Sequence, residues 1–113
     1  MHEVGIIKSM LRTVKGVMDV NGLTKVGKIV VQIGEISGVV PRQIQECYAG
    51  AVYKTPFEET LLDIEVIPGI VRCNHCGKEF NGFTYNLKCP DCNGEDLTAL
   101  SGREFLIKQI EAY

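Results

Sequence analysis

The sequence predicts an α+β fold, in which a small sheet of about three strands packs with two helices and carries an inserted zinc-ribbon-like domain. Helical and strand patterns alternate along the first two-thirds of the 113 residues, and the last third holds two Cys-x-x-Cys pairs. An apolar segment near the C-terminal end supplies a third strand, which the sheet needs because two strands alone are marginally stable. This length suffices for one compact domain with a small satellite.

The first two predicted elements are a helix and a strand. Apolar residues recur at helical spacing, and the Asn21-Gly22 pair is typical of a helix stop, so the helix stripe holds Val4, Ile7, Leu11, Val14 and Met18. Residues 26–33 alternate in the way of a strand. Its inner face is expected to hold Ile29, Val31 and Ile33, with Lys28, Val30 and Gln32 on the other face.

A turn over 34–38 leads into the second helix, since Pro41 suits a first helical turn. The Thr55-Pro56 pair is expected to end this helix. Its predicted inner face holds Ile44, Cys47, Tyr48, Ala51 and Val52. A half-buried strand should follow, because acidic residues alternate with Leu62, Ile64 and Val66.

The Pro68-Gly69 pair marks a boundary, beyond which a separate module runs from about 70 to 102. Short strands are expected inside it near 83–87 and 97–100. The segment 105–110 is predicted to return to the first part of the chain as the third strand. The chain therefore divides into one domain made of 1–69 and 103–113 and a second domain made of 70–102.

Four cysteines of the second domain have the spacing of a metal site, with twelve residues between the two pairs: Cys73, Cys76, Cys89 and Cys92. Each pair forms a tight turn that aims two sulfur atoms at one point, so the four predict a structural zinc ion held at about 2.3 Å per bond. Gly77 and Gly94 are expected to adopt the positive φ angles that such turns need. Unmetallated thiols or a redox pair are the alternative.

The remaining cysteine and one histidine have simpler interpretations. Cys47 lies among apolar residues of a helical pattern and is expected to be a small core side chain. His75 lies inside the first cysteine pair, where it either replaces a thiolate or, as we favour, is an exposed turn residue. Glu35 is interpreted as a solvated turn carboxylate that contacts a partner.

Charge and composition argue against several classes of protein. The net charge is −2, and residues 70–102 hold three basic residues against four acidic ones, so a nucleic-acid-binding zinc ribbon is the weaker alternative and no membrane association is expected. The N-terminal charges interrupt any signal sequence or membrane span, which predicts a cytoplasmic location. No catalytic motif such as HExxH is present, so we do not expect an enzyme.

The first three residues, Met1-His2-Glu3, could chelate a second metal. The terminal amine of Met1, with a pKa of about 7.7–8.0, the amide nitrogen of His2 and its imidazole can form fused chelate rings. Such nitrogen donors favour Ni(II) or Cu(II). Glu3 could supply the fourth donor from its amide or its carboxylate, and a frayed terminus without a metal is the alternative.

Together with the two cysteine pairs, four segments resemble the HypA/HybF family of nickel metallochaperones for [NiFe] hydrogenase maturation, namely 1–3, 33–38, 102–104 and 107–111. The resemblance covers the chain from end to end. It implies that 1–69 and 103–113 form a nickel-binding α/β domain with a zinc-binding domain, 70–102, inserted. It implies that His2 binds Ni(II) as cargo, assisted by backbone nitrogens, and that the four cysteines hold a structural Zn(II).

The same resemblance implies partners for the chain. These are the accessory GTPase HypB and the [NiFe] hydrogenase large-subunit precursor, and in some organisms urease is served as well. The sequence leaves a monomer or a dimer open, and a dimer could arise by exchange of the inserted module or of a strand.

Overall fold

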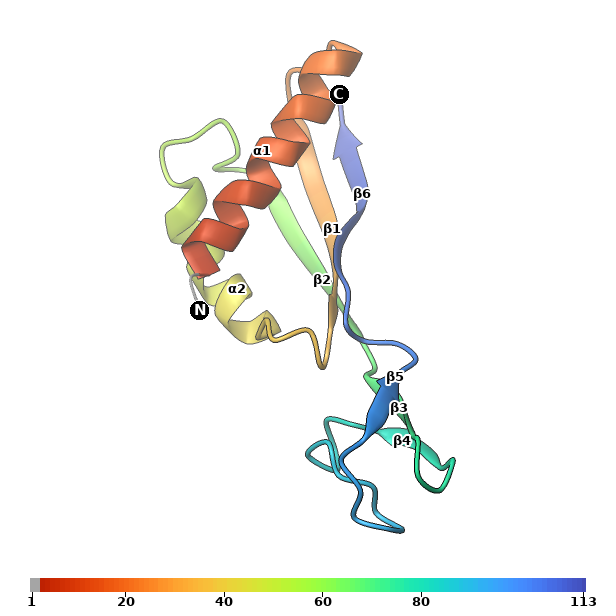
Figure 1. The fold of residues 1–113 in the computed structure, drawn as a ribbon. Helices are drawn as coiled ribbons and strands as arrows, with labels where there is room; N and C mark the ends of the chain where they lie inside the picture. The colour runs from red at the N-terminus through yellow and green to blue at the C-terminus, as the bar shows by residue number, and fades with distance from the viewer. Residues whose placement is uncertain (1–2) are drawn as a thin grey trace.

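A computed structural model describes residues 3–113, and Figure 1 shows that the two helices cover one face of a sheet while a second, smaller sheet lies at the far end of the molecule. The elements in chain order are α1 (Glu3–Asn21), β1 (Val26–Gly34), α2 (Pro41–Val52), β2 (Leu61–Ile67), β3 (Ile70–Cys73), β4 (Glu79–Asn81), β5 (Leu97–Ala99) and β6 (Phe105–Ala112). We call α1, α2, β1, β2 and β6 the body, and residues 70–102 the zinc module.

The sheet of the body has the strand order β2-β1-β6. β1 and β2 are parallel and are joined through α2, because parallel neighbours need a crossover connection. β6 pairs with β1 in the antiparallel direction, with Ile110 opposite Ile29 and a bulge between Val30 and Val31. The prediction that the C-terminal segment returns as the third strand of this sheet is therefore confirmed.

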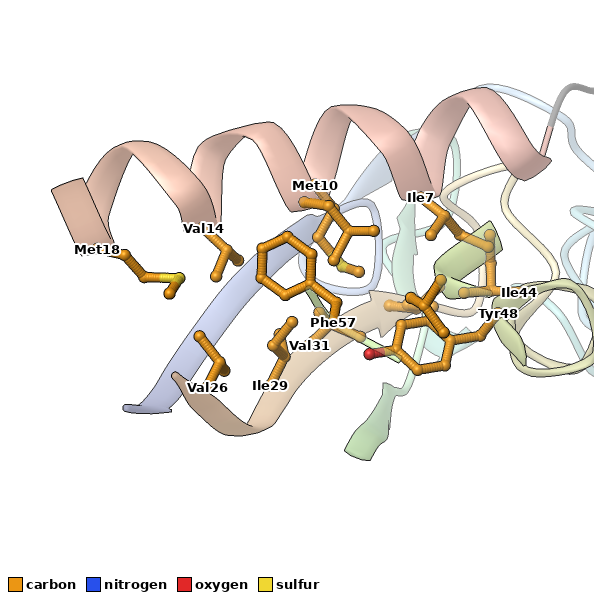
Figure 2. Close-up of a cluster of buried hydrophobic side chains, with 13 residues drawn as sticks. Ile7, Met10, Val14, Met18, Val26, Ile29, Val31, Ile44, Tyr48 and Phe57 are labelled. Atoms are coloured by element: carbon orange, nitrogen blue, oxygen red, sulfur yellow. The ribbon is translucent and has the colours of Figure 1, made fainter. Parts of the chain in front are cut away.

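The core of the body lies between the helices and the sheet. Figure 2 shows side chains of α1 pointing at those of β1, with Phe57 between them and Tyr48 beside them. Both predicted helices are confirmed, although α2 ends at Val52, three residues before Thr55. Four of the five α1 stripe residues are buried; Val4, in the first turn, is 44% exposed. Met10, outside the predicted stripe, is buried because it is next to Leu11 on the face that meets the sheet.

The edge strand β2 follows its predicted alternation over only part of its length. Leu62 and Ile64 pack against the core of the body. Val66, which was expected on the same buried face, is 51% exposed. β2 runs past α2 toward the zinc module at that point, so the last part of the strand is less covered (Figure 1).

The zinc module has a sheet of its own, with the order β4-β3-β5 and antiparallel pairing on both sides of β3. The predicted strand near 97–100 is confirmed as β5. The predicted strand over 83–87 is wrong: this segment is a turn, in which Asn86 (φ 56°) and Leu87 (φ 60°) have left-handed backbone conformations that no strand allows. β4 lies at Glu79–Asn81 instead.

The core of the zinc module is small and separate from that of the body. Its buried members are Val71, Cys73, Phe80 and Cys89. A cluster of this size buries little apolar surface, so the module depends on a further cross-link for its stability. The division at residues 69/70 and 102/103 stays our proposal for the domain boundaries. Between residues 3 and 113, no helix is long and apolar enough to cross a membrane.

Candidate metal centre

The first cysteine pair lies where β3 ends and the chain reverses. The backbone N–H of Cys73 donates to the carbonyl oxygen of Lys78 (2.8 Å), and the N–H of Gly77 donates to the carbonyl oxygen of Cys73 (2.8 Å). Gly77 has φ +80°, a conformation that glycine adopts without strain, as predicted for this turn. The two bonds close a tight loop that turns the Cys73 and Cys76 side chains to the same side.

The second cysteine pair repeats this backbone pattern. The N–H of Cys89 donates to the carbonyl oxygen of Gly94 (2.9 Å), and the N–H of Asn93 donates to the carbonyl oxygen of Cys89 (2.8 Å). The residue with positive φ is Asn93 (φ 61°), not Gly94 as predicted. A Cβ atom on Gly94 would lie 3.2 Å from the Sγ atom of Cys92, a tight contact that glycine avoids. Both turns therefore present two sulfur atoms from equivalent positions.

The two turns bring all four sulfur atoms together, within 4.8 Å of one another. The Sγ atoms of Cys73 and Cys92 are 3.6 Å apart, and those of Cys76 and Cys89 are 3.5 Å apart. A tetrahedral zinc ion with bonds of 2.3 Å requires sulfur–sulfur separations of about 3.8 Å. The donor set therefore fits a four-thiolate zinc ion. These four positions provide no open coordination site for catalysis.

The electrostatics of the four thiols favour a bound cation. Hydrogen bonds from the backbone N–H groups of Cys76 and His75 lower the pKa of the Cys73 thiol to about 6, against the effect of burial. The N–H of Gly94 favours the Cys92 thiolate, but the neighbouring sulfur atoms, Cys73 first, and burial outweigh it and raise the pKa of Cys92 to about 12. Thiolates at this distance repel one another, and a bound cation offsets that repulsion.

Hydrogen bonds that do not involve the cysteine sulfur atoms hold the first turn against β5. The backbone N–H of Asn74 donates to the carbonyl oxygen of Asp96 (2.9 Å), and its Nδ2 donates to the Asp96 carboxylate (3.1 Å). The hydroxyl of Thr98 donates to Oδ1 of Asn74 (2.9 Å). An ion pair between Lys78 and Asp91 (3.5 Å) joins the first turn to the second. These contacts hold the ligands in position beyond the bonds of the turns themselves.

The other candidate residues have different outcomes. His2, the predicted nickel ligand, lies outside the described residues. His75 is exposed in its turn, as expected. Cys47 is half-buried and packs against the core of the body, as expected for a small apolar side chain. The structure therefore brings together the four cysteines of the two pairs and does not add either of these residues to them.

Glu35 is not the solvated turn carboxylate that the sequence suggested. It is half-buried, and its Oε1 atom accepts hydrogen bonds from the backbone N–H of Gly69 (2.9 Å) and from Nδ2 of Asn81 (2.9 Å). The bond to Asn81, followed by that to Gly69, lowers the pKa of Glu35. Sequence reasoning missed this contact, because no local pattern relates residues 46 positions apart.

A family model described as "Hydrogenase/urease nickel incorporation, metallochaperone, hypA" matches residues 1–112. The chain is 34% identical over 111 residues to the hydrogenase maturation factor HypA of Geobacter metallireducens, with 98% of both chains covered. It is 32% identical to that of Dehalococcoides mccartyi, over 98% of this chain and 93% of the relative.

Solved structures share the fold. The solution structure of the Ni metallochaperone HypA from Helicobacter pylori superimposes with a TM-score of 0.67 at 21% identity, over 99% of this chain and 97% of that one. A second, titled "Solution structure of HypA protein", gives a TM-score of 0.66 at 22% identity, over 100% of this chain and 97% of that one. The overall fold of the chain is therefore shared with these structures.

Proposed function

The chain belongs to the HypA family of metallochaperones for nickel incorporation into hydrogenase and urease, and on that premise we propose that it binds Ni(II) through His2 and delivers it during the maturation of a [NiFe] hydrogenase. A separate zinc ion is structural. Urease is the second recipient that we propose, because the family description includes it.

The observation that carries this proposal is that the four thiols gather away from the helix that follows the proposed nickel donors. The four thiols gather in the zinc module, whereas α1 begins in the body beside α2 (Figure 1). Sulfur donors suit Zn(II), and amine, amide and imidazole donors suit Ni(II). Copper would bind the nitrogen donors more tightly than nickel, so selectivity in the cell depends on metal availability and on partners.

The start of α1 supports an amide contribution to nickel binding. α1 begins at Glu3, and the first four N–H groups of an α-helix have no intrahelical acceptor. The amide nitrogen of Glu3 is therefore not needed by the helix. The positive end of the helix dipole also favours a negatively charged, deprotonated amide at this position. Either this amide or the Glu3 carboxylate completes the donor set of Met1 and His2.

A chelate at the end of the chain suits a cargo ion. The proposed donors are separate small groups of the first residues, so a receiving protein can replace them one at a time. The four cysteines act differently: they bind an ion that cross-links the two turns and stabilises a module with a small core. Release of the cargo therefore does not require unfolding of the zinc module.

The partners we propose follow from the same family. They are the accessory GTPase HypB and the large-subunit precursor of a [NiFe] hydrogenase. Relatives named as hydrogenase maturation factors support a role in this machinery.

The test is metal analysis of the untagged chain after nickel loading, combined with X-ray absorption at the nickel and zinc edges. We expect one nickel ion with nitrogen and oxygen ligands and one zinc ion with four sulfur ligands per chain. Sulfur ligands at the nickel edge, or nitrogen ligands at the zinc edge, would contradict the separation of the two sites.

A further inference from the structure

The turn between β1 and α2 reaches from the body into the zinc module. Glu35 follows β1 in the body, Gly69 lies on the segment that enters the module, and Asn81 is the last residue of β4 inside it. One atom, Oε1 of Glu35, accepts hydrogen bonds from both Gly69 and Asn81, each at 2.9 Å. A single carboxylate oxygen therefore connects the body to the interior of the module.

Backbone contacts join the same turn to the two segments that cross between body and module. The N–H of Ile36 donates to the carbonyl oxygen of Gly102 (2.9 Å). A Cβ atom on Gly34 would lie 1.9 Å from the oxygen of Gly102, and one on Gly102 would lie 2.4 Å from Cα of Gly69. These contacts hold the turn against the crossing segments themselves. The hydrogen bond from Asn81 to Glu35 reaches further, to β4.

The neighbouring apolar contact does not fix an orientation by itself. Ile36 packs against the small core of the module, and a Cβ atom on Gly69 would lie 2.8 Å from its Cγ2 atom. Apolar contacts are non-directional, so such packing tolerates rotation of one part against the other. Hydrogen bonds weaken steeply with angle, and bonds to a carboxylate are roughly twice as strong as neutral ones. The two bonds of Glu35 therefore supply a directional contact, and unlike the backbone bond from Ile36 to Gly102, the one from Asn81 reaches β4 inside the module.

Asn81 extends the contact to an exposed loop. While its Nδ2 atom donates to Glu35, its Oδ1 atom accepts a hydrogen bond from the backbone N–H of Thr84 (2.9 Å). Thr84 lies in the turn after β4, next to Phe83, whose side chain is 66% exposed. The orientation of the Asn81 amide is therefore set on one side by the body and on the other by this loop.

We propose that Glu35 is the positioning residue that sets the orientation of the zinc module relative to the body, and with it the position of the exposed Phe83 loop. This goes beyond the proposed function and does not depend on nickel binding. Removal of the carboxylate leaves the zinc site intact and allows the module to turn about its two crossing segments.

The test uses residual dipolar couplings of the full-length, zinc-loaded chain. In the native protein, one alignment tensor should fit the backbone amides of the body and the zinc module together. In Glu35→Ala we expect this common tensor to be lost, with a different tensor for each part and an unchanged zinc content. Glu35→Gln should retain the common tensor, because its amide oxygen still accepts both hydrogen bonds. A common tensor in Glu35→Ala would overturn the proposal.

Two further variants make the result specific. Glu65→Ala removes another half-buried carboxylate, bonded to Gln32 and Lys108 within the body, and should keep the common tensor; loss of it there would also overturn the proposal. If Glu35→Ala does not fold, the same couplings measured on Asn81→Asp test the proposal. This variant keeps an oxygen for the Thr84 N–H and places a second carboxylate against Glu35, so we expect separate tensors, and a common tensor would contradict the role of Glu35.

Discussion

The hydroxyl group of Tyr48 donates a hydrogen bond to the backbone carbonyl oxygen of Thr60 at 2.9 Å, and this bond joins α2 to the residue before β2. Tyr48 is 6% exposed, and burial raises its pKa to about 12. Thr60 is buried as well, and its own hydroxyl donates to the carbonyl oxygen of Val26 (2.6 Å). A chain of two hydrogen bonds thus runs from α2 to the first residue of β1.

Tyr48→Phe should lower the free energy of unfolding by about 1 kcal/mol, because it leaves the Thr60 carbonyl oxygen without this donor while it keeps the aromatic ring. Urea denaturation of the zinc-loaded protein measures the change. Tyr53→Phe is the control, since Tyr53 is 64% exposed and should have no effect. Equal stability of the native protein and Tyr48→Phe would show that the hydrogen bond contributes nothing.

His2→Ala should abolish stoichiometric nickel binding and leave zinc binding and the fold unchanged, because His2 is proposed to supply the imidazole donor. Isothermal titration with Ni(II), together with zinc analysis, measures both. His75→Ala is a matched control, since the chain has two histidines and His75 is exposed in its turn. Loss of both metals from His2→Ala would contradict two independent sites.

A short peptide fused before Met1 should weaken nickel binding, because it converts the proposed amine donor into an amide. The same peptide fused after Tyr113, which is 71% exposed, should have no effect. Nickel titrations of the two fusions provide the comparison. If both bind nickel as well as the native chain, the terminal amine is not a ligand.

Cys73→Ser should lose zinc and, with it, the ordered structure of the zinc module. The body should remain folded, because its core contains no residue of the module. In amide NMR spectra, we therefore expect the signals of β3, β4 and β5 to collapse while those of α1, α2 and β1 persist. Cys47→Ser is the control and should retain zinc. Collapse of the whole spectrum in Cys73→Ser would show that the body needs the module.

Acid should destabilise the junction through Glu35. Its pKa is lowered from an ordinary value of 4.5, by Asn81 first and then Gly69. A carboxylate with a lowered folded-state pKa contributes stability that is present above the unfolded value and is lost as pH falls through the folded value. The urea midpoint of the native protein should therefore fall more steeply between about pH 5 and 3 than that of Glu35→Gln. Parallel curves would contradict the lowered pKa.

Much of the body could be predicted from the sequence, because its signals are local. The apolar spacing of α1 and the Pro41 start of α2 each depend on neighbouring residues, and both helices form as expected. The four cysteines could be found for the same reason, since their spacing encodes two similar turns. The structure brings their sulfur atoms within 4.8 Å of one another, as the two pairs predict for one metal site.

The remainder depends on contacts that no short window contains. Phe83, Thr84 and Tyr85 have strand propensity, but the left-handed conformations at Asn86 and Leu87 make this segment a turn. β3 and β4 are only four and three residues long, too short to show a strand pattern in the sequence. They form because they pair with each other. The contact of Glu35 with Asn81 likewise arises only in the folded chain.

The chain leaves the body after β2 and re-enters it at β6, and these strands are the two immediate neighbours of β1. The exiting and returning segments touch at this edge of the sheet, where a Cβ atom on Gly102 would lie 2.4 Å from Cα of Gly69. Very few residues would be needed to join the two segments directly. The zinc module is therefore an insertion between β2 and β6. Evolution could lengthen, replace or delete it without changing the strand order of the body.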